Sequence, residues 1–443
     1  MTQSSFTART LNVEQFKRPI NRSIPVANIY RNAIDLNRFS NAVARQIVRD
    51  YNAIILSAVE DLRRIDLGLP TEGAGIVSPA SVQAQRLRVI LLQIKESLDR
   101  WADRNTDVVI QQLQGLAELQ TEFAAQQLQI AISGGVAGAR NIDPSVIAQQ
   151  AVRTVEVSPN FAATVAMVDP TDLNFVLPGT GRFSLTAAQG TAITLPNGQI
   201  IQKAFRGLAE SQAQRFNTII RTGLLTGEAT PQIARRLVGT LDFGDLAKTV
   251  RQQALAGGEL TKMADSQILT LVRTSVQQVA NEASQQVYRS NQDVTKKYKY
   301  VATLDERTSP ICRRLDGQEF EYGKGPYPPV HFNCRSTTVA VIDWEGLDLL
   351  PPEAYKKEIG EDSLLFKRAA VGGPVDQDLK YGEWLAKQSA EVKADVWGSQ
   401  KVRYFDLLSK KYGPNQAVTR MVREDGSELT LEQLRRRYGT AES

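Results

Sequence analysis

The chain has 443 residues, a net charge of +5, a hydrophobic fraction of 42% and a charged fraction of 23%, which is the composition of a folded protein with two or three domains. Two cysteines exclude a disulfide framework, and a single histidine excludes any mechanism that needs several. The N-terminal residues lack the apolar core of a secretory signal, and the apolar runs are too short to span a bilayer. We therefore expect a protein made in a reducing cytoplasm, with a charge too mild for a dedicated nucleic-acid binder.

The N-terminal part of the chain predicts an arm followed by long helices. Residues 1–28 are polar and show no periodicity, so we expect an extended arm that lies along a partner. Apolar residues recur at helical spacing from Ile29 to about Leu67, and again from about Ser81 to just before the Ser133–Gly135 segment. Two long amphipathic helices joined by a loop predict an antiparallel hairpin within residues 29–154. We interpret it as a packing core, with a docking surface as the alternative.

The middle of the chain changes character twice. Residues 155–202 are rich in Pro, Gly, Thr and β-branched residues, which predicts a β or loop insertion with a hairpin around Asn197 and Gly198. Further helices are expected over Lys203–Thr222, between the candidate N-cap Thr230 and the stop at Gly239, and over Ala264–Ser290.

The last third of the chain predicts a small β unit and a helical tail. Strands are expected at Tyr298–Leu304 and Ser336–Asp343, on either side of a segment that carries both cysteines and the histidine. Residues 345–378 are interpreted as a linker with one short helix. The tail, residues 379–443, predicts a helical pair broken at Gly398 and a short basic helix capped by Thr430.

These elements together predict a mainly α member of the α+β class. The expected parts are a long N-terminal helical hairpin, a helical middle region, a small β-containing Cys/His unit and a short helical tail. The helical middle region and the Cys/His unit together form one predicted domain, residues 203–344.

The stretch "VHFNCRSTT" places His331, the only histidine, three residues before Cys334, and the other cysteine is Cys312. With Asp305 these side chains could supply four zinc ligands, although the spacing lacks the two close pairs of a strong zinc signature. A Cys312–Cys334 disulfide disagrees with a reducing compartment. A Cys334 nucleophile with His331 as base lacks a third, orienting group. We favour packing, in which the cysteines are buried and a hydrogen-bonded histidine fixes a turn. No cofactor is therefore certain, and zinc is the only candidate.

Charged residues around the cysteines predict structural contacts. Asp305 and Arg307 are expected to pair with groups across the loop, and Arg335 to anchor back to Asp305 or Asp316. The pair Asp316 and Gly317 is typical of a turn.

Lys296, Lys297 and Lys299 alternate with Tyr298 and Tyr300. Such interleaving of basic and aromatic residues could bind single-stranded nucleic acid. A solvated strand face is the interpretation that we prefer.

The segment "DERTSPICRRLDG…PPVHFNCRS" resembles the phage minor head, or head morphogenesis, proteins of the phage Mu protein F type. The matching positions are Asp305, Arg307, Thr308, Cys312, Leu315, Asp316, Gly317, Pro328, Pro329, His331, Asn333, Cys334 and Arg335. The resemblance covers roughly residues 205–440. In the lead-in helix, family members often have Glu where this chain has Ser275. Many members also have further cysteines where this chain has Ser309 and Ser336, so any metal or redox site that those cysteines complete in relatives is reduced here.

The resemblance implies a non-enzymatic, minor structural protein of a tailed phage head. Such a protein would lie in the virion near the portal vertex, in several copies, and would contact the portal protein, the major capsid protein and packaged double-stranded DNA, but no membrane. It would assist prohead assembly and DNA packaging or delivery. The alternatives are a DNA-binding internal or ejected protein, and an enzyme such as a toxin-like hydrolase or transferase that uses the Cys/His motif.

Overall fold

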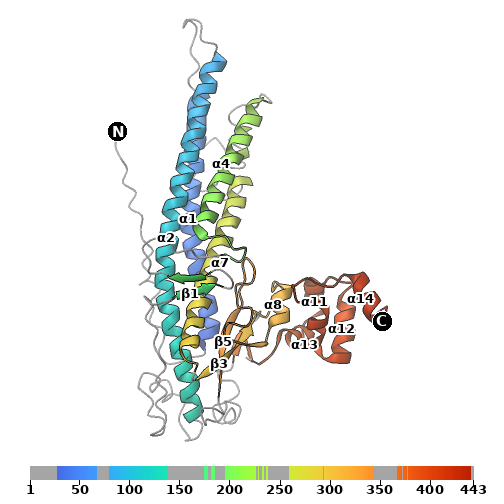
Figure 1. Cartoon of the computed structure of the whole chain (residues 1–443). Helices are drawn as coiled ribbons and strands as arrows, with labels where there is room; N and C mark the ends of the chain where they lie inside the picture. The colour runs from blue at the N-terminus through green and yellow to red at the C-terminus, as the bar shows by residue number, and fades with distance from the viewer. Residues whose placement is uncertain are drawn as a thin grey trace. The chain divides into compact units, whose positions relative to one another are not determined.

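The computed structural model confirms a mainly helical α+β fold with a small antiparallel sheet (Figure 1). It describes residues 27–66, 79–137, 174–177, 181–184, 195–225, 228, 232–233, 236–237, 259–292, 294–343, 367–371, 373–376 and 378–440. Most of the predicted arm, together with Thr230 and Gly239, lies outside these residues. Among the described helices none is sufficiently long and apolar to traverse a lipid bilayer.

The chain divides into two compact units. One contains residues 38–113 and 192–275, and the other contains residues 1–37, 114–191 and 276–443. The Cys/His segment lies wholly in the second of these units. The predicted domain boundaries are a different division of the chain and stay a prediction.

The first unit is a bundle of long helices. Its members are drawn from α1 (Ala27–Asp66), α2 (Pro79–Ala137), α4 (Ile201–Leu225) and α7 (Glu259–Ser290). Trp101 is fully buried between α1 and α4, with its ring edge-on to Tyr51 and Phe205 and its indole N–H donating to the Ile47 carbonyl. The hydroxyl of Tyr51 donates to Gln212 of α4 at 2.9 Å, so a polar contact joins α1 and α4 inside the apolar core.

The predicted N-terminal hairpin is confirmed. Ile47 and Trp101 lie at similar sequence distances from the connection between α1 and α2 and contact each other, so the two helices run antiparallel. Helix α2 continues to Ala137, through the serine and glycines where we expected it to end. Since glycine lowers helix propensity without forbidding a helix, the pattern alone placed this end too early.

The predicted β insertion contains a strand pair, but this pair lies before the Asn197–Gly198 turn at which we expected it. Strands β1 (Asn174–Leu177) and β2 (Gly181–Ser184) pair antiparallel. Asn197 and Gly198 do form a tight turn, in which Gly198 has φ of +79° and its amide donates to the Leu195 carbonyl. The predicted second strand of that hairpin is wrong, because α4 begins at Ile201, directly after the turn.

The second unit carries a three-stranded antiparallel sheet of order β4-β3-β5. Its strands are β3 (Thr295–Val301), β4 (Glu319–Glu321) and β5 (Thr337–Ile342). Strands β3 and β5 confirm the two predicted strands and pair directly. The short helix α8 (Pro310–Leu315) lies between β3 and β4 in sequence, so the motif has one helix and one strand that we did not predict.

Helix α7 is held to this sheet by a row of amides. Gln277 and Asn281 donate to the Ser336 carbonyl, and Gln285 donates to the Thr338 hydroxyl at 2.8 Å. These residues lie on one face of α7 at intervals of four, so one helix face holds the strand that follows the histidine and Cys334.

The tail folds into a compact helical cluster. Its helices are α10 (Tyr381–Ala386), α11 (Ala390–Trp397), α12 (Val402–Tyr412), α13 (Pro414–Met421) and α14 (Leu431–Tyr438). Gly398 ends α11, and Thr430 caps α14 in a reciprocal arrangement with Gln433, as predicted. The predicted linker instead contains a β-hairpin, β6 (Lys367–Ala370) with β7 (Gly373–Asp376).

Candidate functional site

The histidine and the second cysteine are brought together by a tight turn. The Cys334 amide donates to the His331 carbonyl at 3.3 Å, so the two side chains come from the first and last residues of one turn. Asn333 has φ of +57°, a left-handed conformation that Asn tolerates better than most residues other than Gly. The sequence "HFNC" therefore has its asparagine where the turn needs it.

The first cysteine comes from the short helix α8. Ser309 is the N-cap, with its hydroxyl accepting from the Cys312 amide, and Pro310 occupies the first helical turn, where its missing N–H costs nothing. Cys312 is 1% exposed and packs in a small core with Tyr300, Leu315 and Cys334. Capping and burial together aim its thiol at the turn that carries the histidine.

The three side chains form one cluster, the Cys/His cluster, made of Cys312, His331 and Cys334. The Sγ atoms of the two cysteines are 3.7 Å apart, and the Cys312 Sγ is 3.2 Å from His331 Nε2. Their potential ligand atoms all lie within 4.8 Å of one another. The Tyr300 hydroxyl, from β3, is 3.2 Å from the Cys312 sulfur and 4.0 Å from that of Cys334.

The two thiols are electrostatically different. The hydrogen bond from the Cys312 thiol holds the pKa of Cys334 well below its ordinary value, against the effect of burial and with help from His331. The same hydrogen bond, with burial added, raises the pKa of Cys312 well above its ordinary value. One proton shared between two close sulfurs explains both directions, because the first thiolate formed disfavours the second.

The histidine has a defined tautomer in its neutral form. Its Nδ1 is 2.7 Å from the Phe332 carbonyl oxygen, which can only accept, so Nδ1 carries a proton. Its Nε2 is 2.7 Å from the Ser309 hydroxyl and accepts from it in the neutral ring. Burial lowers the pKa of His331, but the neighbouring Cys334 sulfur and the Phe332 carbonyl outweigh it and raise the pKa overall.

Asp305 is not part of the cluster. Its carboxylate receives the Arg335 guanidinium in a two-pronged ion pair, with Nη2 at 2.8 Å from Oδ1, and also accepts from the Arg307 amide and the Thr308 hydroxyl. The predicted Asp305–Arg335 pair is therefore present. A carboxylate with its oxygens used in this way is not free to be the fourth ligand of a metal at the cysteines.

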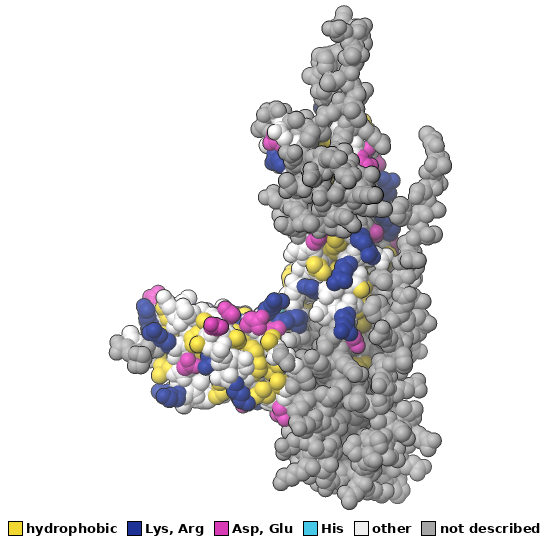
Figure 2. All heavy atoms as spheres, turned by 180° about the vertical axis from the view of Figure 1, so that it is seen from behind, with side chains coloured by type: hydrophobic (Ala, Val, Ile, Leu, Met, Phe, Trp, Pro, Cys, Tyr) yellow, Lys and Arg dark blue, Asp and Glu magenta, His cyan; other side chains and the backbone are white. Residues whose placement is uncertain are grey.

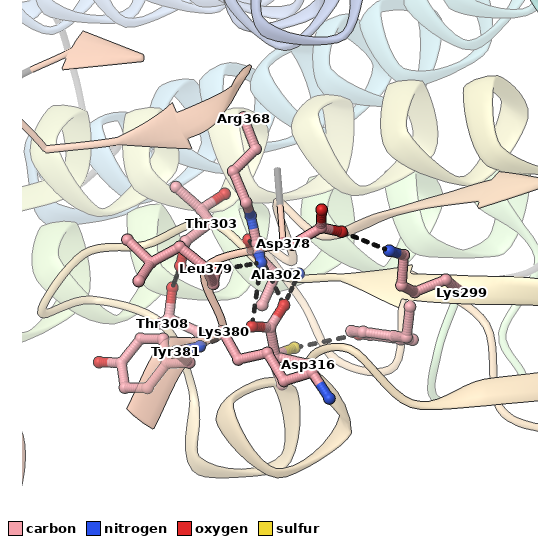
Figure 3. Close-up of polar contacts among 12 residues, drawn as sticks. Lys299, Ala302, Thr303, Thr308, Asp316, Arg368, Asp378, Leu379, Lys380 and Tyr381 are labelled. Carbon is pink, nitrogen blue, oxygen red and sulfur yellow. Dashed lines mark hydrogen bonds and ion pairs between the residues drawn. The ribbon is translucent and has the colours of Figure 1, made fainter. Parts of the chain in front are cut away.

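Asp316 is the buried centre of a second network, drawn in Figure 3. Its carboxylate accepts from the Ala302 amide at 2.8 Å, the Tyr381 amide at 2.7 Å and both terminal nitrogens of Arg368. The side chains of Asp316 and Arg368 are 1% and 5% exposed. This network ties together β3, the end of α8, the β6-β7 hairpin and the start of α10.

Arg368 and the two arginines of α8, Arg313 and Arg314, were not predicted as contact residues. Arg313 donates to the Val396 carbonyl at 3.1 Å and to Glu428, and its guanidinium lies 5.3 Å from the centre of the Trp397 ring. Arg314 donates to the Thr419 and Val422 carbonyls at 2.6 and 2.8 Å. The only signal in the sequence was the unusual pair of arginines directly after a buried cysteine.

Two further motif residues occupy special positions. Gly317 has φ of +75°, and a Cβ there would lie 2.8 Å from the Lys380 side chain, which explains the glycine after Asp316. Arg307 is largely exposed and pairs with its neighbour Glu306, so it contributes little to the packing around the cluster.

The three lysines of β3 do not form a stacking platform. Tyr298 and Tyr300 are 1% and 0% exposed, so their rings cannot stack on bases while the sheet is folded. Lys296 pairs with Asp343 at 2.5 Å and Lys299 with Asp378 at 3.4 Å. Figure 2 shows one face on which basic side chains alternate with acidic and apolar ones among the described residues.

Comparison with known proteins finds a family that is similar to part of the chain. Residues 214–339, which include the Cys/His cluster and both carboxylates, match the family described as Phage Mu protein F like protein. The resemblance stated from the motif is thereby confirmed over this segment.

Two curated relatives match shorter stretches. An uncharacterized protein of Haemophilus influenzae is 32% identical over 112 residues, which cover 22% of this chain and 25% of that protein. The "NAD(+)--arginine ADP-ribosyltransferase EFV" of Enterococcus faecalis is 24% identical over 205 residues, which cover 43% of this chain and 34% of that protein. The chain thus spans about a quarter to a third of the curated relatives that it matches. No solved structure matches.

Proposed function

Because residues 214–339 carry a segment of the phage Mu protein F-like family, we propose that the protein is a minor structural component of a tailed bacteriophage head. A structural role in head morphogenesis rests on the family match. We propose further that the protein lies in the virion near the portal vertex, assists prohead assembly, and takes part in DNA packaging or delivery.

The observation that carries a structural role is how the motif's charged residues are used. Asp305, Asp316, Arg313 and Arg335 all make ion pairs or hydrogen bonds within the chain. Asp316 and Arg313 are buried, and each contacts a segment more than 50 residues away. A motif whose charges hold distant segments together is better suited to positioning surfaces than to turnover.

The surfaces that this scaffold would present are helical. In the first unit α2 leaves Val89 and Leu92 on its exposed side, 52% and 60% accessible, one helical turn apart. We propose that the portal protein and the major capsid protein are the partners, that several copies surround the portal, and that the long helices and the arm make the contacts.

Contact with packaged double-stranded DNA is a second role that the charge allows. Lys297 of β3 is exposed and could contact phosphates, whereas the buried tyrosines beside it could not read bases. A DNA-binding internal or ejected protein would show affinity that falls steeply as salt is added. With a net charge of +5 we expect only weak, non-specific binding.

An enzymatic role is the remaining alternative. The match covers only about a third of the length of the transferase of Enterococcus faecalis. It therefore does not show that this chain has the same activity. Incubation of the purified protein with labelled NAD and an arginine-rich acceptor should give no transfer of label. Transfer that is lost in His331→Ala while the protein stays folded would establish an enzyme instead.

The proposed function is tested by inactivating the gene for this chain in the genome of the phage that carries it. A stop codon early in the gene should lower the yield of filled, infectious heads, and the chain supplied from a plasmid should restore the yield. Normal yields of infectious particles without the chain would refute a role in head assembly.

A further inference from the structure

We propose that Cys312, His331 and Cys334 bind one zinc ion, with the Ser309 hydroxyl oxygen at the fourth position, and that this ion fastens α8 to the turn at residues 331–334. The site goes beyond the proposed role in the phage head and does not depend on it. Two thiolates and an imidazole are donors that zinc prefers.

The separations of the donor atoms fit a tetrahedron around zinc. With Zn–S bonds of about 2.3 Å and a Zn–N bond of about 2.0 Å, a tetrahedral site has S–S edges of about 3.8 Å and S–N edges of about 3.5 Å. The two sulfurs are 3.7 Å apart, and the Cys312 sulfur is 3.2 Å from His331 Nε2. The third separation, between the Cys334 sulfur and His331 Nε2, lies within 4.8 Å.

The histidine is already oriented as a metal ligand. Its Nδ1–H donates to the Phe332 carbonyl at 2.7 Å, so the lone pair of the neutral ring lies on Nε2, the atom that faces the Cys312 sulfur. Metal-bound histidines characteristically donate their other ring N–H to a carbonyl or carboxylate, which fixes the ring and raises its basicity. This contact is independent of the spacing between the sulfurs.

The fourth position follows from the capping residue of α8. Ser309 Oγ lies 2.7 Å from His331 Nε2 and 3.4 Å from the Cys312 amide nitrogen, so its oxygen is beside two of the three donor residues. Asp305, which we first considered for this place, is engaged by Arg335. Serine is a weak neutral ligand, so the position also admits a water molecule when Ser309 stays on the Cys312 amide.

The bound ion would have a structural consequence beyond the cluster. Helix α8 carries Cys312, and the two arginines that follow it hold other segments through carbonyl contacts: Arg313 contacts α11, and Arg314 contacts α13 and the residue that follows it. A zinc ion that fixes α8 would therefore stabilise the attachment of the C-terminal helices to the sheet. Loss of the ion would loosen this attachment before it unfolds the long helices.

The test is the metal content of the intact chain. The protein should be produced in zinc-supplemented cells with a tag that contains no histidine, purified without chelator and analysed for zinc. We expect about one zinc ion per chain. The variants Cys312→Ser, Cys334→Ser and His331→Gln should lose it, whereas Arg307→Ala, an exposed change in the same motif, should retain it.

Cobalt replacement of zinc in the unaltered chain gives a readout that does not depend on variants folding. Tetrahedral coordination by two thiolates predicts intense sulfur-to-cobalt charge-transfer absorption and visible bands of a four-coordinate site. The proposal is overturned if the unaltered chain has reduced thiols and carries no zinc, or if Cys312→Ser and Cys334→Ser keep full zinc content. Octahedral cobalt spectra without sulfur charge transfer would overturn it equally.

Discussion

Asp316 connects three segments of the second unit through its buried carboxylate. Its carboxylate accepts two backbone amides and both terminal nitrogens of Arg368, and both side chains are almost completely buried. A buried ion pair adds little stability compared with an apolar pair, but removing one partner leaves a desolvated charge behind. The effect of substitution at this site should therefore be large and strongly non-additive.

The first prediction concerns this pair. Asp316→Ala should lower the free energy of unfolding by about 3–5 kcal/mol, because Arg368 is left buried without its carboxylate. Adding Arg368→Met to that variant should restore part of the loss, as measured by urea denaturation and a double-mutant cycle. Asp378→Ala, which removes the exposed partner of Lys299, is the matched control and should change little. Simple additivity of the two buried changes would contradict the coupling.

The second prediction concerns Asp265 of α7, in a hollow lined by Arg45, Arg49 and Leu269. Burial raises the pKa of Asp265 to about 6, and one of its carboxylate oxygens makes no hydrogen bond within the described residues. The folded chain thus binds this proton more tightly than the unfolded chain, so stability falls as pH rises from about 4 to about 6.

Asp265→Asn should remove this penalty. It should stabilise the protein at pH 7 by about 1 kcal/mol, a figure reduced for partial solvent screening, and should have no stabilising effect near pH 4. Thermal unfolding at the two pH values measures the difference. Equal stabilisation at both would mean that the carboxyl is not desolvated.

At this scale the sequence predicted contacts that are close along the chain better than distant ones. The pairing of Asp305 with Arg335 could be proposed because both belong to one motif. The partner of Asp316 lies 52 residues away, in a segment that we interpreted as a linker. No periodicity connects two charges at that separation, so only the fold could reveal it.

Among the elements, the short helix α8 contacts several different parts of the second unit. It has six residues, too few to be stable alone. It packs into the small core around Cys312 and Cys334 and is also hydrogen-bonded to the C-terminal helices. Arg314 satisfies the Thr419 and Val422 carbonyls at the end of α13, groups that a helix leaves without partners within itself.

The third prediction follows from this contact. Arg314→Met should lower stability by about 1–3 kcal/mol, because it removes charged hydrogen bonds to two carbonyls. Hydrogen exchange should accelerate in α13 and α14 while α7 stays protected. Glu424→Ala, which removes only the exposed ion-pair partner of Arg314, is the control. Uniform acceleration over the whole chain would show that α8 does not dock the tail specifically.

Elements with strong periodicity were predicted, whereas the shortest strands and the six-residue helix α8 were not. Helices α1, α2, α4 and α7 and strands β3 and β5 follow from repeating apolar positions. Strands β4, β6 and β7 have three or four residues, too few to establish an alternation. The Asn197–Gly198 turn was recognised, but the same turn chemistry can introduce a helix as well as a second strand.

At the scale of the whole molecule, the chain combines a helical bundle with a motif that connects distant segments, and residues 1–28 are expected to form an arm. The Cys/His cluster was foreseen as a group, while its ligand geometry was not, because spacing along the chain does not determine which atoms meet. The zinc proposal and the head proposal are separate: a metal-free chain could still assemble into heads, and a zinc protein need not.

The fourth prediction concerns the arm. Deletion of residues 1–26, which stops before α1 begins at Ala27, should reduce the copies of the chain in purified heads, because the arm is proposed to lie along a partner. Quantitative mass spectrometry of the particles measures the copy number. Deletion of residues 441–443 is the control and should leave it unchanged. An unchanged copy number without the arm would assign the contact to the helices.

The central claim is that this chain is a structural part of a phage head, and a reconstruction of purified particles without imposed symmetry tests it most directly. The account predicts density for the helical bundle and the Cys/His unit inside the head beside the portal, in several copies. Complete particles whose density and protein composition are explained without this chain would contradict the account.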